Sequence, residues 1–261
     1  MRARFTVARI PYLNVQPFCA DWQRLPARSV EMAPRQLGQE ARAGRVDAGV
    51  MAAADFFELE DAFERVGPFG IACRGTVESV LLLARAPVTA LGGARVWLTP
   101  ESSTSAALVR LLLERRFALG GLRFERAAAP RPERIAEGEA WLAIGDAALA
   151  ARHDAPQEVC LDLGAAWTEW TGLPFVYAVW AIRRTLPAAD RAAFAAFLDA
   201  SLARGERDLA GLARAHAAAR AGALGPPEPL ERYLGRFTYR RGAAAEVGLA
   251  AFRRLGMEFV P

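Results

Sequence analysis

Short apolar runs alternate with amphipathic stretches along most of this chain, and this alternation predicts strands followed by helices. In the first part of the chain we expect strands at 4–10, 29–33 and 47–52, and helices at 15–24 and 34–43. In the middle we expect strands at 94–99, 122–127 and 140–145, and helices at 103–118 and 131–138. Strands and helices that alternate in this way are typical of α/β layers.

The two groups of elements resemble each other, which indicates two similar lobes. The stretches 41–57 and 135–150 both contain a helix end, an acidic residue, an apolar strand and a turn of small residues. Two extended apolar segments, 78–87 and 173–184, are predicted to cross between the lobes. Helices at 187–220 and 242–255, on either side of a proline-rich break at 225–229, are expected to complete the chain.

A chain that leaves one lobe, builds a second and then returns makes the first lobe discontinuous. We therefore predict an α/β, two-lobed fold of the type II periplasmic-binding-protein kind, in which mixed or parallel sheets are flanked by helices. The first lobe is expected to comprise 1–83 and 176–261, and the second 84–175. A ligand cleft is expected between them.

In open parallel sheets, ligands bind beyond the carboxyl ends of the strands. Five stretches are therefore predicted to line the cleft: Tyr12–Asn14, Ala52–Asp55, Gly75–Ser79, Ser102–Ser105 and Gly145–Asp146. Several of them begin helices, whose free N–H groups favour anions. Hydroxyls and amides outnumber titratable groups in these stretches, so they suit a small polar anion better than an apolar ligand.

Each candidate residue also has a purely structural explanation. Asn14, Asp146 and one residue of the Ser/Thr run 102–105 can serve as helix caps. Ser79 can be an ordinary strand residue, and Gly75 a turn glycine. However, four hydroxyls in a row exceed what a cap requires, so we expect this run to bind an anion.

Composition excludes several classes of function. All 33 basic side chains are arginine, so lysine Schiff-base chemistry, pyridoxal phosphate and a Walker A loop are excluded. The formal net charge of +4 comes from scattered arginines, which argues against nucleic-acid binding. No apolar run is long enough to span a membrane, and the N-terminus does not resemble a signal peptide. We therefore expect a cytoplasmic protein with no membrane partner.

The few cysteines and histidines suggest neither a metal site nor any other cofactor site. Cys19, Cys73 and Cys160 are widely spaced, without the C-x-x-C spacing of many zinc sites. His153 is expected in a loop, and His216 on a solvated helix surface. Neither histidine has a Ser, Cys or Asp at a recognisable catalytic spacing.

The ordered motifs resemble the MqnA family, the chorismate dehydratases of the futalosine route to menaquinone. They read RIPYLNxxPF, GTVESVLL, SSTSAALVRLLL, AIGDAAL and DLGAAWTEWTGLPFVYAVW, and the likeness spans roughly residues 5–183. The chain departs from the family pattern at Pro11 and at Ala52–Ala54. The sister family MqnD, whose members form 1,4-dihydroxy-6-naphthoate, shares the fold and TGLP but generally lacks YLN and IGD.

The resemblance implies a hydro-lyase that removes water from chorismate to give 3-[(1-carboxyvinyl)oxy]benzoate, with chorismate as its small-molecule partner and no cofactor. It suggests Asn14, Ser79 and Asp146 as catalytic residues. The implied substrate-binding residues are Tyr12, Gly75, Ser103, Thr104, Ser105 and Gly145.

Alternatives remain for the catalytic base and for the function. Asp146 and a carboxylate of the substrate are both candidates for the base. An MqnD-type enzyme and a non-catalytic small-anion binding protein remain alternative functions on the same fold. The sequence leaves the oligomeric state open.

Overall fold

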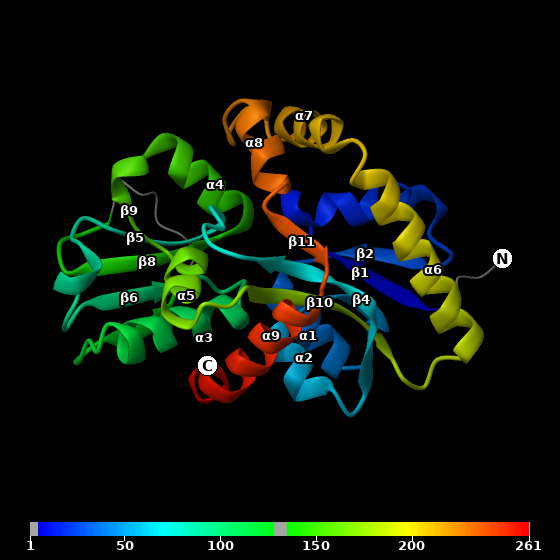
Figure 1. The fold of residues 1–261 in the computed structure, drawn as a ribbon, viewed down its shortest axis with the longest axis horizontal. Helices are drawn as coiled ribbons and strands as arrows, with labels where there is room; N and C mark the ends of the chain where they lie inside the picture. The colour runs from blue at the N-terminus through cyan, green and yellow to red at the C-terminus, as the bar shows by residue number, and fades with distance from the viewer. Residues whose placement is uncertain (1–4, 128–134, 261) are drawn as a thin grey trace.

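The computed structural model describes residues 5–127 and 135–260, and it contains two β-sheets that form two lobes side by side (Figure 1). The predicted two-lobed α/β arrangement is therefore confirmed. Residues 131–134 of the helix expected at 131–138 lie outside the described residues, and residues 135–138 form a loop and a turn, not a helix. No helix within the described ranges is long and apolar enough to cross a membrane.

The sheet of the first lobe has the strand order β11-β4-β10-β3-β1-β2. Strand β1 pairs in parallel with β2 and β3, whereas β10 runs antiparallel to β3 and β4. The strands are β1 (Thr6–Arg9), β2 (Arg28–Glu31), β3 (Ala48–Ala52), β4 (Phe63–Cys73), β10 (Phe175–Arg183) and β11 (Phe237–Arg240). Buried residues run the whole length of β3, as expected for a central strand covered on both faces.

The sheet of the second lobe has the order β7-β6-β8-β5-β9. Strand β6 pairs in parallel with β7 and β8, and β5 runs antiparallel to β8 and β9. The strands are β5 (Val80–Ala84), β6 (Arg95–Leu98), β7 (Arg123–Arg126), β8 (Glu139–Ile144) and β9 (Val159–Asp162). In both lobes the parallel strands direct their carboxyl ends toward the other lobe.

The boundary between the lobes corrects one prediction. Strand β5 pairs with β8 and β9 of the second sheet, so residues 80–83 do not belong to the first lobe as predicted. The chain crosses instead through residues 74–79. It returns through residues 172–174, which lead into β10 of the first sheet. The expected second boundary, between 175 and 176, lies within a residue of this return.

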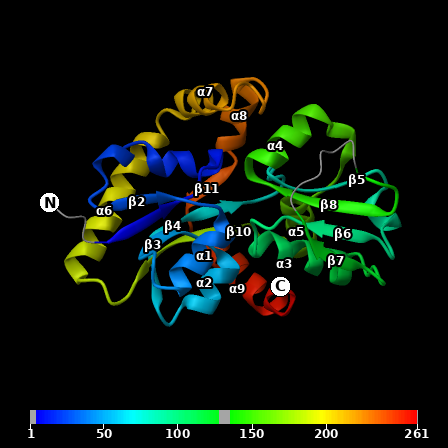
Figure 2. The same cartoon turned by 180° about the vertical axis from the view of Figure 1, so that it is seen from behind.

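Helices cover both faces of the first sheet (Figures 1 and 2). On one face Trp180 of β10 packs against Phe18 and Phe194, with ring centroids 5.4 and 5.8 Å away. On the other face Phe175 lies 4.9 Å from Phe252 of the last helix. The helices are α1 (Pro34–Arg42), α2 (Ala53–Leu59), α3 (Thr104–Leu111), α4 (Gly145–Asp154), α5 (Leu163–Thr171), α6 (Ala188–Gly205), α7 (Leu209–Ala219), α8 (Pro227–Leu234) and α9 (Ala243–Gly256).

Local details differ from the predicted elements for identifiable reasons. The helix expected at 15–24 is two short 3-10 helices, Leu13–Cys19 and Trp22–Arg24, and Pro17 lies inside the first. Proline has no N–H to donate, so a regular α-helix is disfavoured there. The proline-rich break at 225–229 contains the start of α8, whose first residue is Pro227. Strands β4, β9 and β11 were not predicted.

Candidate active site

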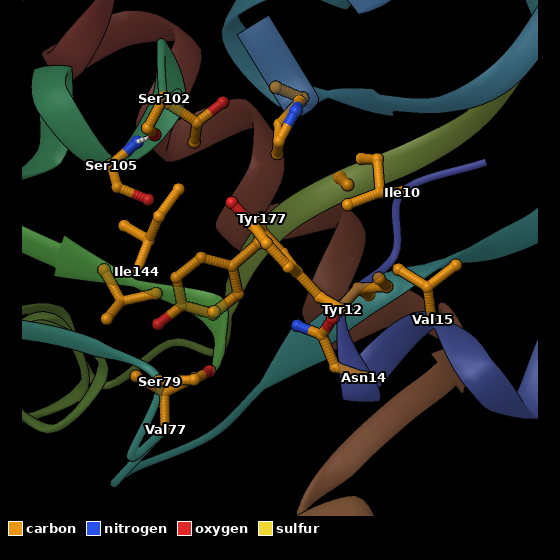
Figure 3. Close-up of a pocket in the computed structure, with 17 residues that line it drawn as sticks. Ile10, Tyr12, Asn14, Val15, Val77, Ser79, Ser102, Ser105, Ile144 and Tyr177 are labelled. Carbon is orange, nitrogen blue, oxygen red and sulfur yellow. Dashed lines mark hydrogen bonds between the residues drawn. The ribbon is translucent and has the colours of Figure 1, made fainter. Parts of the chain in front are cut away.

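A cavity lies between the two lobes, at the carboxyl ends of their parallel strands. All five stretches expected from the sequence contribute to it, as Figure 3 shows for the labelled residues. The space that a water-sized centre can occupy inside the cavity is about 70 Å³, so the lobes leave only a small cavity between them. Its lining is Ile10, Tyr12, Asn14, Val15, Pro34, Ala52, Ile71, Val77, Ser79, Val80, Ser102, Thr104, Ser105, Ile144, Gly145, Tyr177 and Ala178.

Asn14 reaches the cavity because β1 ends at Arg9 and a 3-10 helix begins at Leu13. Its side-chain oxygen Oδ1 is buried and has no hydrogen-bond partner among the described residues. Leaving a buried acceptor unsatisfied costs about 1–3 kcal/mol. A ligand with a hydroxyl or N–H group would therefore satisfy Asn14 and gain affinity from it.

Ser79 lies on the same side of the cavity as Asn14, one residue before β5 (Figure 3). Tyr233 of α8 donates its hydroxyl proton to Ser79 Oγ at 2.9 Å. Burial raises the pKa of Tyr233 above its ordinary value, so the phenol stays protonated and can act as this donor. The proton of the Ser79 hydroxyl is then left free for a ligand. Sequence reasoning missed Tyr233.

Tyr177 of β10 is a second residue that the sequence did not suggest. Tyr177 lines the cavity, and its hydroxyl is buried without a hydrogen-bond partner among the described residues. Burial raises the pKa of Tyr177 well above its ordinary value, so it is a neutral donor. Together, Asn14 and Tyr177 place one unsatisfied acceptor and one unsatisfied hydroxyl at the cavity.

Ser102 and Ser105 lie across the cavity from Asn14 and Ser79 (Figure 3), but the hydroxyls of the serine and threonine run are not equivalent. Ser102 Oγ accepts the N–H of Ser105 at 3.0 Å and so caps the first turn of α3. Thr104 Oγ1 accepts the N–H of Ala54 at 2.9 Å, a contact that joins the two lobes. Both residues and Ser105 line the cavity, as predicted for the stretch Ser102–Ser105.

Ser103 does not line the cavity, because its side chain pairs with Asp55 of α2. Burial raises the pKa of Asp55 to about 6, and the hydrogen bond from Ser103 opposes that shift. The prediction that Ser103 contacts substrate therefore has no support in its position. Gly75 also lies outside the lining; its N–H donates to Thr168 Oγ1 at 2.9 Å.

Tyr12 and Gly145 form one wall of the cavity together. The backbone of Gly145 is left-handed, with φ 56°, and a Cβ there would lie 2.7 Å from the Tyr12 ring. Tyr12 donates its hydroxyl proton to Glu101 of the second lobe. The Tyr12 ring therefore spans the gap between the lobes. It passes so close to residue 145 that only glycine fits there.

Asp146 does not line the cavity, although it follows Gly145 directly. Its carboxylate accepts the N–H of Leu13 and contacts His216 and the Arg220 guanidinium. His216 is only 7% exposed, so the expectation of a solvated histidine is wrong. The sequence could not show this because His216 lies 70 residues from its partner.

The described residues that line the cavity include few titratable side chains. Of the described residues that line it, only Tyr12 and Tyr177 are titratable, and burial raises the pKa of both. The described residues contain no cluster of three or more His, Cys, Asp or Glu that could hold a metal ion. The lining therefore offers neutral donors and acceptors, and any base must come from elsewhere.

Comparison with known proteins assigns the chain to a family. A sequence model described as menaquinone biosynthesis matches residues 5–258. The chain belongs to this menaquinone-biosynthesis family. A curated relative from Thermus thermophilus, named chorismate dehydratase, is 32% identical over 96% of this chain and 94% of its own length. The resemblance drawn from the sequence motifs is thereby confirmed.

Solved structures confirm the predicted fold. Protein AF1704 from Archaeoglobus fulgidus has a TM-score of 0.76 and 18% identity, with 96% of each chain covered. The periplasmic aliphatic sulphonate binding protein SsuA from Escherichia coli has a TM-score of 0.63 and 17% identity, with 98% of this chain and 93% of that chain covered. At these identities the likeness establishes the periplasmic-binding-protein-like fold alone.

Proposed function

We propose that this protein is a chorismate dehydratase, a hydro-lyase that converts chorismate and releases water. The observation that carries the proposal is the relative of that name, which is 32% identical along almost the whole chain. The cavity supports it, because unsatisfied hydroxyl and amide groups suit a small ligand with carboxylates and a hydroxyl. We retain a cytoplasmic location as a prediction.

The proposed reaction breaks the C3–H and C4–O bonds of chorismate. The proton at C3 is acidified because it is vinylogous to the ring carboxylate, and the hydroxyl at C4 leaves as water. Because the ring becomes aromatic, the protein has mainly to position the substrate and to stabilise developing charge. Neutral donors and acceptors can perform both tasks.

We assign the residues of the cavity as follows. The free proton of Ser79 and the amide of Asn14 would orient the ring and its leaving hydroxyl. Thr104 and Ser105, with the N–H groups at the start of α3, would hold one carboxylate. Tyr12 and Gly145 would shape the wall.

The base in this proposal is a carboxylate of the substrate. No Asp, Glu or His lies among the described residues of the lining, and both oxygens of Asp146 already have protein partners. Chorismate carries its carboxylates with it, so one of them is in the cavity whenever substrate is bound. This carboxylate takes the proton from C3, and the proton then leaves with the C4 hydroxyl as water. Asp146 is therefore given no contact with substrate.

The test of the function is incubation of the purified protein with chorismate while the ultraviolet spectrum is followed. We expect the absorbance of the cyclohexadiene to disappear and that of the substituted benzoate to grow. If the diene persists although chorismate binds in calorimetry, a non-catalytic binding protein is indicated. If chorismate neither reacts nor binds, an MqnD-type substrate becomes the better hypothesis.

Replacing Tyr177 with phenylalanine should change stability and activity in opposite directions. Loss of a buried hydroxyl without a partner should raise the free energy of unfolding by about 1 kcal/mol. Loss of the same donor to substrate should raise KM for chorismate by about 10-fold. Denaturant unfolding and steady-state kinetics measure the two effects.

Tyr239→Phe is the matched control, because the Tyr239 hydroxyl is also buried but donates to the carbonyl oxygen of Leu234 at 3.3 Å. This variant should lose about 1 kcal/mol of stability and keep the wild-type KM. If Tyr177→Phe behaves like this control, the Tyr177 hydroxyl does not bind substrate.

A further inference from the structure

A cluster of contacts joins the second lobe to the backbone immediately before Asn14. Helix α4 belongs to the second lobe and begins with Gly145 and Asp146. Asp146 Oδ1 accepts the N–H of Leu13 at 3.1 Å, 133 residues away in sequence. The next residue, Asn14, carries the unsatisfied oxygen of the cavity.

The second oxygen of Asp146 is held by the C-terminal part of the chain. His216 Nε2 lies 2.8 Å from Oδ2, and Arg220 Nε donates to the same oxygen at 3.0 Å. Arg220 also donates from Nη2 to the carbonyl oxygen of Pro11 at 2.8 Å. One carboxylate therefore ties α4 to the end of α7 and to the segment Pro11–Leu13.

Elements of the first lobe hold the partners of Asp146 in place. Helix α7 contacts both α8 and the 3-10 helix Leu13–Cys19. His216 and Arg220 therefore form a binding site on the first lobe for the Asp146 carboxylate of the second lobe. The Asp146 side chain is 15% exposed, so water weakens these contacts less than at an open surface.

We propose that Asp146 is a positioning residue that latches the lobes in the closed arrangement in which Asn14 meets the cavity. It acts through Leu13, His216 and Arg220, and not through substrate. The kinetic consequence of this inference rests on the proposed dehydratase function, but the closure of the lobes does not.

A latch and a catalytic carboxylate predict different kinetics. If the closed state is populated less often, the apparent affinity for substrate falls in proportion to the population of that state. Saturating substrate restores closure. Removal of the latch should therefore raise KM and leave kcat nearly unchanged. Removal of a general base should lower kcat at every substrate concentration.

The experiment compares Asp146→Ala with Asp21→Ala. Asp21 is a matched control because its side chain is 14% exposed and pairs with Arg204 Nη1 at 3.0 Å, as Asp146 pairs with Arg220, but wholly within the first lobe. Small-angle X-ray scattering without ligand should give a larger radius of gyration for Asp146→Ala than for wild type. Asp21→Ala should match wild type.

In assays with chorismate, Asp146→Ala should raise KM by about 10-fold, with kcat within about twofold of wild type. Arg220→Ala should shift both the radius of gyration and KM in the same direction by less. If Asp146→Ala does not fold, Asp146→Asn, which keeps an oxygen for Leu13, takes its place in both measurements.

Two outcomes would overturn the latch: an unchanged radius of gyration in the Asp146 variants, or a fall in kcat of about 100-fold with KM unchanged. An inactive wild-type protein would instead contradict the proposed function, and the scattering comparison would still decide whether the latch exists.

Discussion

Replacing Asn14 with alanine should lower kcat/KM for chorismate by about 100-fold or more. The Asn14 amide lies at the cavity with a buried oxygen that has no hydrogen-bond partner among the described residues. In the proposed reaction the N–H group of this amide donates to the leaving oxygen, an interaction that strengthens as the C4–O bond breaks and negative charge develops on that oxygen. Most of the loss should therefore appear in kcat, measured by following the diene absorbance under steady-state conditions.

The stability of Asn14→Ala separates this role from a structural one. Because the oxygen has no partner in the part of the chain that the structure describes, its removal should leave the free energy of unfolding unchanged or slightly higher. Gln16→Ala is the matched control on the same 3-10 helix, since Gln16 donates to the Tyr12 carbonyl at 3.1 Å and does not line the cavity. It should keep wild-type activity. Wild-type turnover by Asn14→Ala would remove Asn14 from the site.

Replacing Gly145 with alanine should also reduce kcat/KM by roughly 100-fold, because the new methyl group displaces the Tyr12 ring from the cavity wall. A Cβ at position 145 would lie 2.7 Å from a ring carbon of Tyr12, well inside van der Waals contact. The left-handed backbone adds about 1–2 kcal/mol of strain for any residue other than glycine. Steady-state kinetics and denaturant unfolding measure the two consequences.

Gly44→Ala provides the control for backbone strain alone. Gly44 is left-handed as well, with φ 76°, but a Cβ there would meet nothing within 4 Å, and it lies in an exposed turn after α1. This variant should lose about 1–2 kcal/mol of stability with unchanged activity. Full activity in Gly145→Ala, with a stability loss no larger than that of Gly44→Ala, would show that the Tyr12 wall does not matter for turnover.

The amino-acid pattern was sufficient to predict the alternation of strands and helices and the division into two lobes. Apolar residues at alternating or continuous positions predicted β1, β3, β6 and β8, because the period of a strand is a local property. The carboxyl-edge rule then brought Tyr12, Asn14, Ser79, Thr104 and Gly145 to one cavity without any long-range information. The resemblance of the motifs supplied the family.

The pattern was insufficient where a short element depends on its neighbours. Strands β9 and β11 are only four residues long, and each is stabilised by pairing with an adjacent strand of its sheet. The assignment of β5 to the second lobe depends in the same way on its pairing with β8 and β9. The local pattern can mark a run such as 80–84 as extended, but it does not specify the strand with which that run pairs.

By itself, the sequence determined which backbone segments meet at the cavity, because alternating strands and helices predict parallel strands, whose carboxyl ends lie at one edge of the sheet. Only the tertiary structure decided which side chains are free to act there. Tyr233 reaches Ser79 across 154 residues, and His216 reaches Asp146 across 70. Whether a hydroxyl or carboxylate is already satisfied depends on such distant partners. Packing of the whole chain therefore leaves Asn14 and Tyr177 unsatisfied, while Asp146 is engaged between the lobes.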